Sequence, residues 1–127
     1  MTPTHSIFRQ IFVIAKSIGD TYDYLPGVES KYPFMYIGES FTTDTSSSDL
    51  NGNMTQSIHI YGKLTDRKTI MEIETELHNQ LHRLREAYGY HLSIGNYTTR
   101  LLPYNTEVQP LLHLVVDVNF IYTRKEQ

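Results

Sequence analysis

Apolar residues recur at helical spacing in two stretches of the chain. The first stretch places isoleucine on one helical face, at Ile7, Ile11, Ile14 and Ile18. This pattern predicts an amphipathic helix from about residue 4 to residue 18, capped by Thr2 and stopped by Gly19. Phe8 and Phe12 add a second apolar stripe beside the first. One stripe is enough to pack on the chain's own sheet, so we expect a neighbouring subunit to cover Phe8 and Phe12.

The second stretch predicts another helix from the same kind of spacing. Its apolar positions step by three or four residues through Ile70, Ile73, Leu77, Leu81, Leu84 and Tyr88. We expect Asp66 or Thr65 to cap this helix and Gly89 to end it. Polar residues fill the opposite face, which is typical of a helix with one side in water: Lys68, Glu72, Glu76, Asn79 and Arg83.

Four other stretches alternate apolar and polar residues, which is the pattern of half-buried strands. They cover residues 34–41, 55–63, 90–97 and 112–122. The segments at residues 19–32 and 101–110 are predicted to be connections, because proline occurs in both of them. The last strand is long for a small domain, and long strands that extend beyond a core are suited to pairing with another subunit.

A polar segment separates the first two predicted strands. It covers residues 42–53, with Leu50 as its only large apolar residue. A hairpin needs about two to five linking residues, so we expect a long exposed loop that contacts something outside the domain. The expected contact residues are Thr43, Asp44, Thr45, Ser46, Ser47, Ser48, Asp49, Leu50 and Asn51. The alternative interpretation is a mobile tip without a role.

The order of predicted elements is helix, strand, strand, helix, strand, strand. Helices on one face of a sheet bury an apolar stripe from each helix, so the sequence predicts an α+β fold. We expect a four-stranded, mainly antiparallel sheet, two helices packed on one face, and a long loop between the first two strands. At 127 residues, the whole of 1–127 is expected to form a single domain.

Composition narrows the possible classes of function. The formal net charge is −3, whereas a nucleic-acid-binding surface is normally basic. No apolar run is long enough to cross a bilayer, and the first residues lack the pattern of a signal peptide. The chain contains no cysteine, which excludes a disulfide, a thiolate metal site and a cysteine nucleophile. We therefore expect a soluble protein made in the cytoplasm.

Six histidines raise the question of metal binding or acid–base catalysis. His78 and His82 have the spacing of a helical metal site, with Glu74 one turn before them. However, the zinc-protease motif requires Glu where this chain has Asn79. Three others fall at outward-facing strand positions, outside any catalytic motif: His59, His91 and His113. We predict no catalytic, cofactor-binding or metal-binding residues, and therefore no enzyme.

The amphipathic first helix and three later segments together resemble a known family. The segments are residues 32–38 (Tyr-Pro-Phe-Met-Tyr-Ile-Gly), residues 58–61 (Ile-His-Ile-Tyr) and the predicted helix between Arg67 and Leu84. In this order they resemble the tail-completion proteins of siphophages, of the type found in phages of Gram-positive hosts. These proteins are also called tail terminators or tail-to-head joining proteins. The resemblance covers nearly the whole chain.

The resemblance implies a virion protein without catalytic residues. It implies a homo-oligomer, a hexameric ring that caps the completed tail tube and joins the tail to the head. The implied partners are the chain itself, the major tail tube protein and the head–tail connector protein. The implied location is the head–tail junction of the virion, and the host cytoplasm during assembly. DNA passes through such a ring without specific binding, which suits a mildly acidic chain, and no membrane or cofactor is implied.

Two other interpretations remain open. A different phage neck or connector protein shares most of these sequence features. A small ligand-binding or enzymatic α+β domain would instead use the histidines of its sheet. The mass of the protein in solution distinguishes assembly from ligand binding: a stable ring indicates assembly, and a monomer that binds a metabolite or a metal indicates a ligand-binding domain.

Overall fold

Two helices and six strands follow one another in the described part of the chain. The computed structural model describes residues 2–27, 30–44, 51–106 and 109–125. The helices are α1 (Pro3–Ile18) and α2 (Arg67–Arg83), and a short 3-10 turn, η1 (Leu64–Asp66), precedes α2. The strands are β1 (Thr21–Tyr22), β2 (Phe34–Asp44), β3 (Asn51–Lys63), β4 (Glu86–Ala87), β5 (Tyr90–Asn105) and β6 (Pro110–Arg124).

All six strands belong to one mixed sheet, in the order β1-β2-β3-β6-β5-β4. The four long strands pair antiparallel with their neighbours. The two-residue β1 pairs parallel with β2 at one outer edge, and β4 pairs antiparallel with β5 at the other. The predicted α+β class is confirmed, whereas the predicted four-stranded sheet is wrong. Strands of two residues are too short to show alternation, so their residues carry no strand signal.

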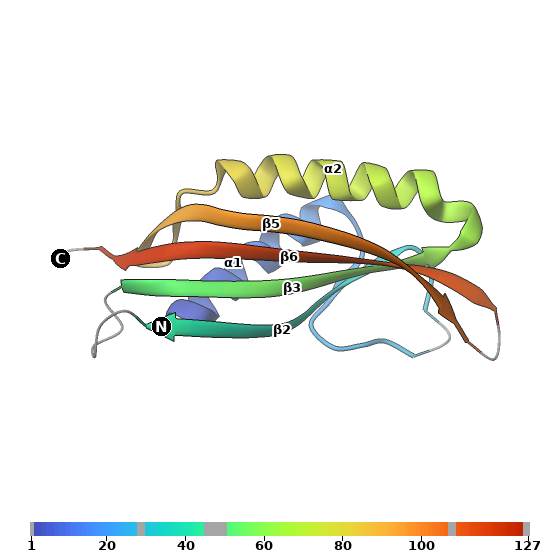
Figure 1. Cartoon of the computed structure of the whole chain (residues 1–127), viewed down its shortest axis with the longest axis horizontal. Coiled ribbons are helices and arrows are strands. Elements are labelled where there is room, and N and C mark those ends of the chain that lie inside the picture. Colours follow the sequence, from blue (N-terminus) through green and yellow to red (C-terminus); the bar gives the residue numbers. More distant parts are fainter. Residues whose placement is uncertain (1, 28–29, 45–50, 107–108, 126–127) are drawn as a thin grey trace.

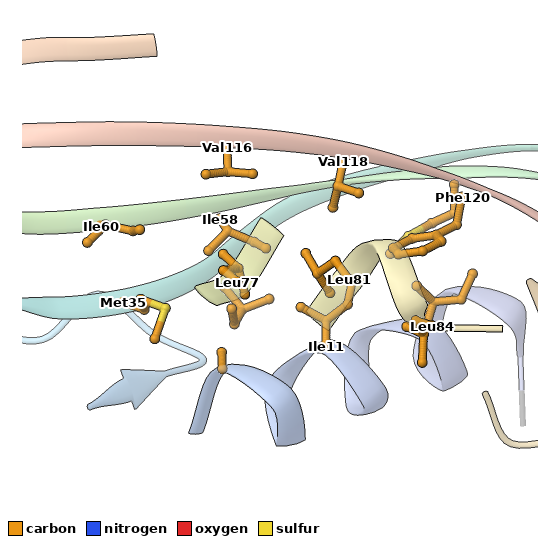
Figure 2. Packing of buried hydrophobic residues seen from close by; sticks show 14 of the residues in the cluster. Ile11, Met35, Ile58, Ile60, Leu77, Leu81, Leu84, Val116, Val118 and Phe120 are labelled. Atoms are coloured by element: carbon orange, nitrogen blue, oxygen red, sulfur yellow. The ribbon is translucent and has the colours of Figure 1, made fainter. Parts of the chain in front are cut away.

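One hydrophobic core joins both helices to one face of the sheet (Figure 2). The helices contribute Ile7, Ile11, Ala15, Ile70, Leu77 and Leu81. The two central strands contribute Met54, Ile58, Ile60, Val116, Val118 and Phe120. Apart from Ala15, each of these side chains stabilises the fold by about 1.5–3 kcal/mol when it is fully buried. Figure 1 shows α1 behind the sheet, so the viewer looks onto the opposite face, which no described helix covers.

The first helix begins and ends where its sequence predicts. The Thr2 side chain accepts a hydrogen bond from the His5 N–H at 3.2 Å, which satisfies one free donor of the first turn. Pro3 fits the first helical position because an N–H there has no helical partner to lose. Gly19 follows the last turn, and its N–H donates to the Ala15 carbonyl. The local signals at both ends are therefore sufficient to define α1.

The second helix ends earlier than its apolar spacing predicts. Asp66 precedes the helix as predicted, but its carboxylate accepts the Lys63 N–H instead of a helical one. Leu84 is already extended, and the chain continues into β4. A turn at Tyr88 and Gly89, with φ of 33° and 95°, then leads into β5. The predicted helix through Tyr88 is wrong because these positive φ values form a tight hairpin turn, for which Gly89 is suited.

Residues 42–44 and 51–53 of the predicted loop are strand, so the predicted loop bounds of 42–53 are wrong. Pairing continues outward to Asp44, which lies opposite Gly52. What remains between the two strands is residues 45–50, which lie outside the described residues. Gly52 is buried, and a Cβ on it would lie 2.4 Å from the Thr43 carbonyl oxygen. A glycine thus permits close strand pairing at this point, which the polar composition of the segment does not reveal.

The connection predicted at residues 101–110 is also strand for most of its length. β5 continues to Asn105, which pairs with Pro110 at the start of β6. Both prolines are tolerated, because Pro103 lies on a strand near the sheet edge and Pro110 begins a strand. The β2–β3 and β5–β6 hairpins therefore reach opposite ends of the sheet (Figure 1).

Candidate functional site

The sheet face opposite the helices carries a connected group of histidine, tyrosine and acidic side chains. Alternate residues of β3 point to this face, because the residues between them are buried in the core. The register places Tyr61 between Phe34 of β2 and His113 of β6, and it places His59 beside Tyr36. We call this surface the open face, and it is formed by the outward-facing residues of β2, β3, β6 and β5.

Three side chains on the open face form a continuous hydrogen-bonded chain. Glu39 Oε1 lies 2.6 Å from His59 Nε2, and His59 Nδ1 lies 2.7 Å from His113 Nε2. A carboxylate only accepts, so the His59 Nε2–H donates to Glu39. Between His59 Nδ1 and His113 Nε2, one ring nitrogen donates and the other accepts, according to the tautomer of each ring. The chain crosses β2, β3 and β6 and joins His113 to Glu39 through His59.

Burial and neighbouring groups shift the pKa values in this chain. The hydrogen bond from His59 holds the pKa of Glu39 below its ordinary value. Burial, together with the nearby His59 and Arg100, lowers the pKa of His113 to about 4. Burial also raises the pKa of Tyr61. Near neutral pH, His113 is therefore uncharged and Glu39 is ionised.

Aromatic rings enclose the histidine pair. The rings of His113 and Tyr61 stack with their centroids 4.2 Å apart and 11° between their planes. The His59 ring stacks on Tyr36 at 5.6 Å. Tyr104 of β5 meets the rings of Tyr61 and His113 edge-on, at 5.7 and 6.1 Å. These contacts keep water from His113, which explains why burial is the largest cause of its lowered pKa.

A second polar group lies beside the histidines. Ser57 Oγ donates to Asp117 Oδ1 at 2.5 Å, and Arg100 of β5 approaches the other carboxylate oxygen at 3.9 Å. The Arg100 side chain is 63% exposed, so this ion pair contributes little stability. Ser57 donates to Asp117 and not to a histidine. The two groups therefore lack the serine–histidine–acid order of a hydrolase relay.

A buried amide sets the position of Glu39. β2 contains a bulge at Gly38 and Glu39, where its register with β3 shifts. Gln56 is 1% exposed, and its Nε2 donates to the carbonyls of Gly38 and Glu39 at 3.0 and 3.1 Å. A bulge changes the direction of a side chain relative to the regular strand. Here the bulge, held by Gln56, lets Glu39 reach His59 on the neighbouring strand.

A small aromatic cavity opens beside this group. Its volume is about 200 Å³, and its lining includes Leu25, Tyr32, Phe34, Tyr61, Tyr104 and Leu111. Pockets for small molecules usually have volumes of about 300–1,000 Å³. The cavity is therefore smaller than most small-molecule pockets, and its aromatic lining suits one apolar side chain or a ligand of similar size.

The predicted contact residues fall into three structural settings. Phe8 and Phe12 are half-buried, with ring centroids 5.9 Å apart, and pack against the margin of the core. Thr43 and Asn51 are exposed strand residues near the end of the β2–β3 hairpin, and Asp44 ends β2. The other predicted contacts lie outside the described residues: Thr45, Ser46, Ser47, Ser48, Asp49 and Leu50.

The histidine pair on α2 belongs to a packed boundary between helix and sheet. The ring centroids of His78 and His82 lie 3.9 Å apart, and the His78 ring also packs edge-on against Tyr97 of β5. The Tyr97 hydroxyl donates to Glu74 at 3.0 Å, and burial raises its pKa. Over the described residues, no group of three metal-ligating side chains is placed to hold a metal ion.

The hydrogen-bonded chain of the open face was not predicted from the sequence. Alternation places His59 and His113 at outward-facing positions, and this was the only available signal. It does not reveal that β3 and β6 are neighbours or which residues lie opposite each other. Glu39 lies at a bulge, where alternation fails. Sequence reasoning therefore found two of the three members but not their contact.

Comparisons with known proteins add no family assignment. No protein-family model matches the chain, and no curated protein matches it. Within the described ranges, no helix has the length and apolar character required to cross a membrane. The surfaces of the molecule are therefore the basis for a functional proposal.

Proposed function

We propose that this chain is a phage virion assembly protein of the tail-completion type. It forms a ring on the finished tail tube and joins the tail to the head connector. The observation that carries the proposal is the distribution of exposed large apolar side chains over separate elements of the fold. A ring subunit needs contact surfaces for two neighbours and for the structures on either side of the ring, whereas a binding module needs a single site.

The exposed apolar residues come from both layers of the fold. They lie on α1, the α1–β2 connection, η1, the β4–β5 turn and three long strands: Val13, Tyr24, Leu25, Phe41, Leu64, Tyr88, Leu102, Tyr104 and Ile121. Scattered apolar residues are normal on any surface. The most exposed of these are aromatic, with Phe41 at 65% and Tyr24 at 61%. Exposed aromatic residues are enriched among those that contribute most to interfaces.

The charge of the chain agrees with a position around passing DNA. The formal net charge is −3. Binding to duplex DNA depends on lysine and arginine residues that neutralise phosphates. A mildly acidic ring has little attraction for the phosphates, so DNA can pass through without being held.

Deletion of the gene from the phage that encodes this chain tests the proposal. A terminator occupies the growing end of a polymer, so we expect DNA-filled heads and unattached tails, many of them longer than normal. Electron micrographs measure both outcomes, and supplying the wild-type chain in trans is the matched control. Normal-length tails joined to heads would rule out the proposed function. Unattached tails of normal length would indicate a different neck or connector protein.

The aromatic cavity favours a second candidate, a small ligand-binding domain. Its lining offers Tyr61 and Tyr104 as flat apolar surfaces for a small ligand. This candidate predicts a monomer whose melting temperature rises with a metabolite, and a Tyr104→Ala variant that loses the effect. The measurement of mass in solution, with and without tail tubes, distinguishes it from a ring-forming protein.

A further inference from the structure

The two outer edges of the sheet lack a strand partner over most of their length. β1 covers β2 only at residues 35–36, and β4 covers β5 only at residues 90–91. The Leu92 N–H also donates to the Arg85 carbonyl at 2.8 Å. Among the described residues, this leaves the outer edges of residues 37–44 and 93–105 without a neighbouring strand. Such edges carry backbone N–H and C=O groups that can pair with a strand of another chain.

The two edge strands carry opposite charges. β2 contains the acidic residues Glu39 and Asp44 and no basic residue, while β5 contains Arg100 and no acidic residue. The side chains of Glu39 and Arg100 are 72% and 63% exposed, although they contact His59 and Asp117. Both therefore keep most of their surface available to a partner of opposite charge.

Exposed apolar side chains accompany the charges on both edges. Phe41 on β2 is 65% exposed, and Leu102 and Tyr104 on β5 are 40% and 43% exposed. Phe41 lies opposite Thr55, and Leu102 lies opposite His113, so the register places both on the open face. If the two edges joined, these apolar residues would belong to one continuous surface.

Strand direction favours the same contact. The strands β2, β3, β6 and β5 alternate in direction, so β2 and β5 run opposite to each other. A second copy placed alongside in the same orientation brings its β2 antiparallel to β5 of the first copy. Such a contact is head-to-tail, and its repetition closes a ring or extends a filament.

We propose that the outer edge of β2 pairs with the outer edge of β5 in the next copy of this chain. Each edge is interrupted by one register shift, so the regular stretches that can pair are residues 40–44 and part of 97–105. We place Glu39 of one copy opposite Arg100 of its neighbour, which sets residues 40–42 against residues 97–99 in antiparallel order. This inference rests on the proposed function, because it names the surfaces through which the ring closes.

Engineered cysteines test the contact without background, because the natural chain contains none. The double variant Glu39→Cys/Arg100→Cys is treated with a short bis-maleimide crosslinker under conditions of assembly. We expect a ladder of covalent multimers, because each copy reacts with a neighbour on either side. Each single variant alone should give no ladder, and an equal mixture of the two single variants should stop at dimers.

Amide hydrogen exchange of the wild-type chain gives a second measurement that needs no substitution. On assembly, we expect exchange within residues 40–44 and within part of 97–105 to slow by at least about tenfold, because pairing protects edge amides. Exchange in the centre of α2 is the internal control and should not change.

The outcomes separate this inference from the proposed function. Rings that give no ladder and leave the edge amides unprotected would overturn the edge pairing and leave the proposed function standing. A ladder from a protein whose deletion leaves virions normal would overturn the proposed function and support the edge pairing. Crosslinked dimers from one single variant alone would indicate a two-fold contact and overturn the head-to-tail arrangement. A chain that stays monomeric even with tail tubes would overturn both.

Discussion

At the scale of single residues, His113 is the side chain whose protonation the fold opposes most clearly. Its ring is stacked on Tyr61 and hydrogen-bonded to His59. Burial and the nearby His59 and Arg100 lower its pKa to about 4, compared with an ordinary value of about 6.5. The unfolded chain therefore binds a proton on this residue at pH values where the folded chain does not.

This difference predicts a loss of stability in mild acid. Above about pH 6.5, His113 is uncharged in both the folded and the unfolded chain, and the free energy of unfolding is at its full value. Between about pH 6.5 and pH 4 the unfolded chain binds more protons at this residue, so the free energy of unfolding falls as the pH falls. Glu39 acts in the same direction at more acidic pH, because its pKa is also lowered. Urea unfolding between about pH 8 and pH 4 measures the effect.

The matched variant for this experiment is His113→Gln, which keeps a polar side chain but cannot titrate. Its stability should be lower than that of the wild type near neutral pH, because the stacking on Tyr61 is lost. Its loss of stability between about pH 6.5 and pH 4 should be smaller than that of the wild type. Parallel curves for the two proteins would show that His113 does not titrate as described.

At the scale of elements, local signals predict an element better than they predict its end. α1 stops after Ile18 because Gly19 is a local stop. The end of α2 has no such signal, because Leu84 and Tyr88 keep helical spacing beyond the last helical residue. α2 ends because the chain beyond it forms β4, which pairs with β5. The spacing of apolar residues gives no sign of that pairing. β1 and the outer part of the β2–β3 hairpin were missed for the same reason.

The candidate site, like the elements, could be predicted from the sequence only in part. The alternation of β3 and β6 predicts that His59 and His113 face outward, which is a local property of each strand. Their contact joins residues 54 positions apart and depends on the register of two long strands. The third member, Glu39, is placed by a bulge and by buried Gln56. The sequence therefore predicts the residue types on the surface but not their connection.

The β2–β3 hairpin provides a prediction at the element scale. A Cβ at Gly52 would lie 2.4 Å from the Thr43 carbonyl and 2.5 Å from the Tyr122 hydroxyl, so a methyl group must displace the strand. We expect Gly52→Ala to destabilise the protein by about 1–3 kcal/mol, measured by urea unfolding. Gly27→Ala is the control, because a Cβ there meets nothing within 4 Å. Unchanged stability in Gly52→Ala would contradict the close pairing and favour a longer loop.

At the scale of the whole molecule, the surfaces that form the core differ from those that we propose for assembly. The helices and one face of the sheet bury each other, which accounts for the stability of the single chain. The open face, the two sheet edges and the exposed residues of α1 contribute little to that core. In α1, Phe8 packs on the margin of the core while Val13 is 53% exposed. The sequence pattern grouped Phe8 with the contact surface, but its half-burial gives it a part in folding as well.

Two aspartate substitutions in α1 separate these roles. Phe8→Asp places a charge against Phe12 and the core margin, so we expect a loss of about 1–3 kcal/mol in urea unfolding. Val13→Asp lies on the exposed side and should change stability by no more than about 0.5 kcal/mol. A new unpaired charge in a subunit contact costs about 2–5 kcal/mol. We therefore expect Val13→Asp to reduce the fraction of heads with joined tails in electron micrographs. A normal fraction would confine the assembly contacts to surfaces other than the exposed side of α1.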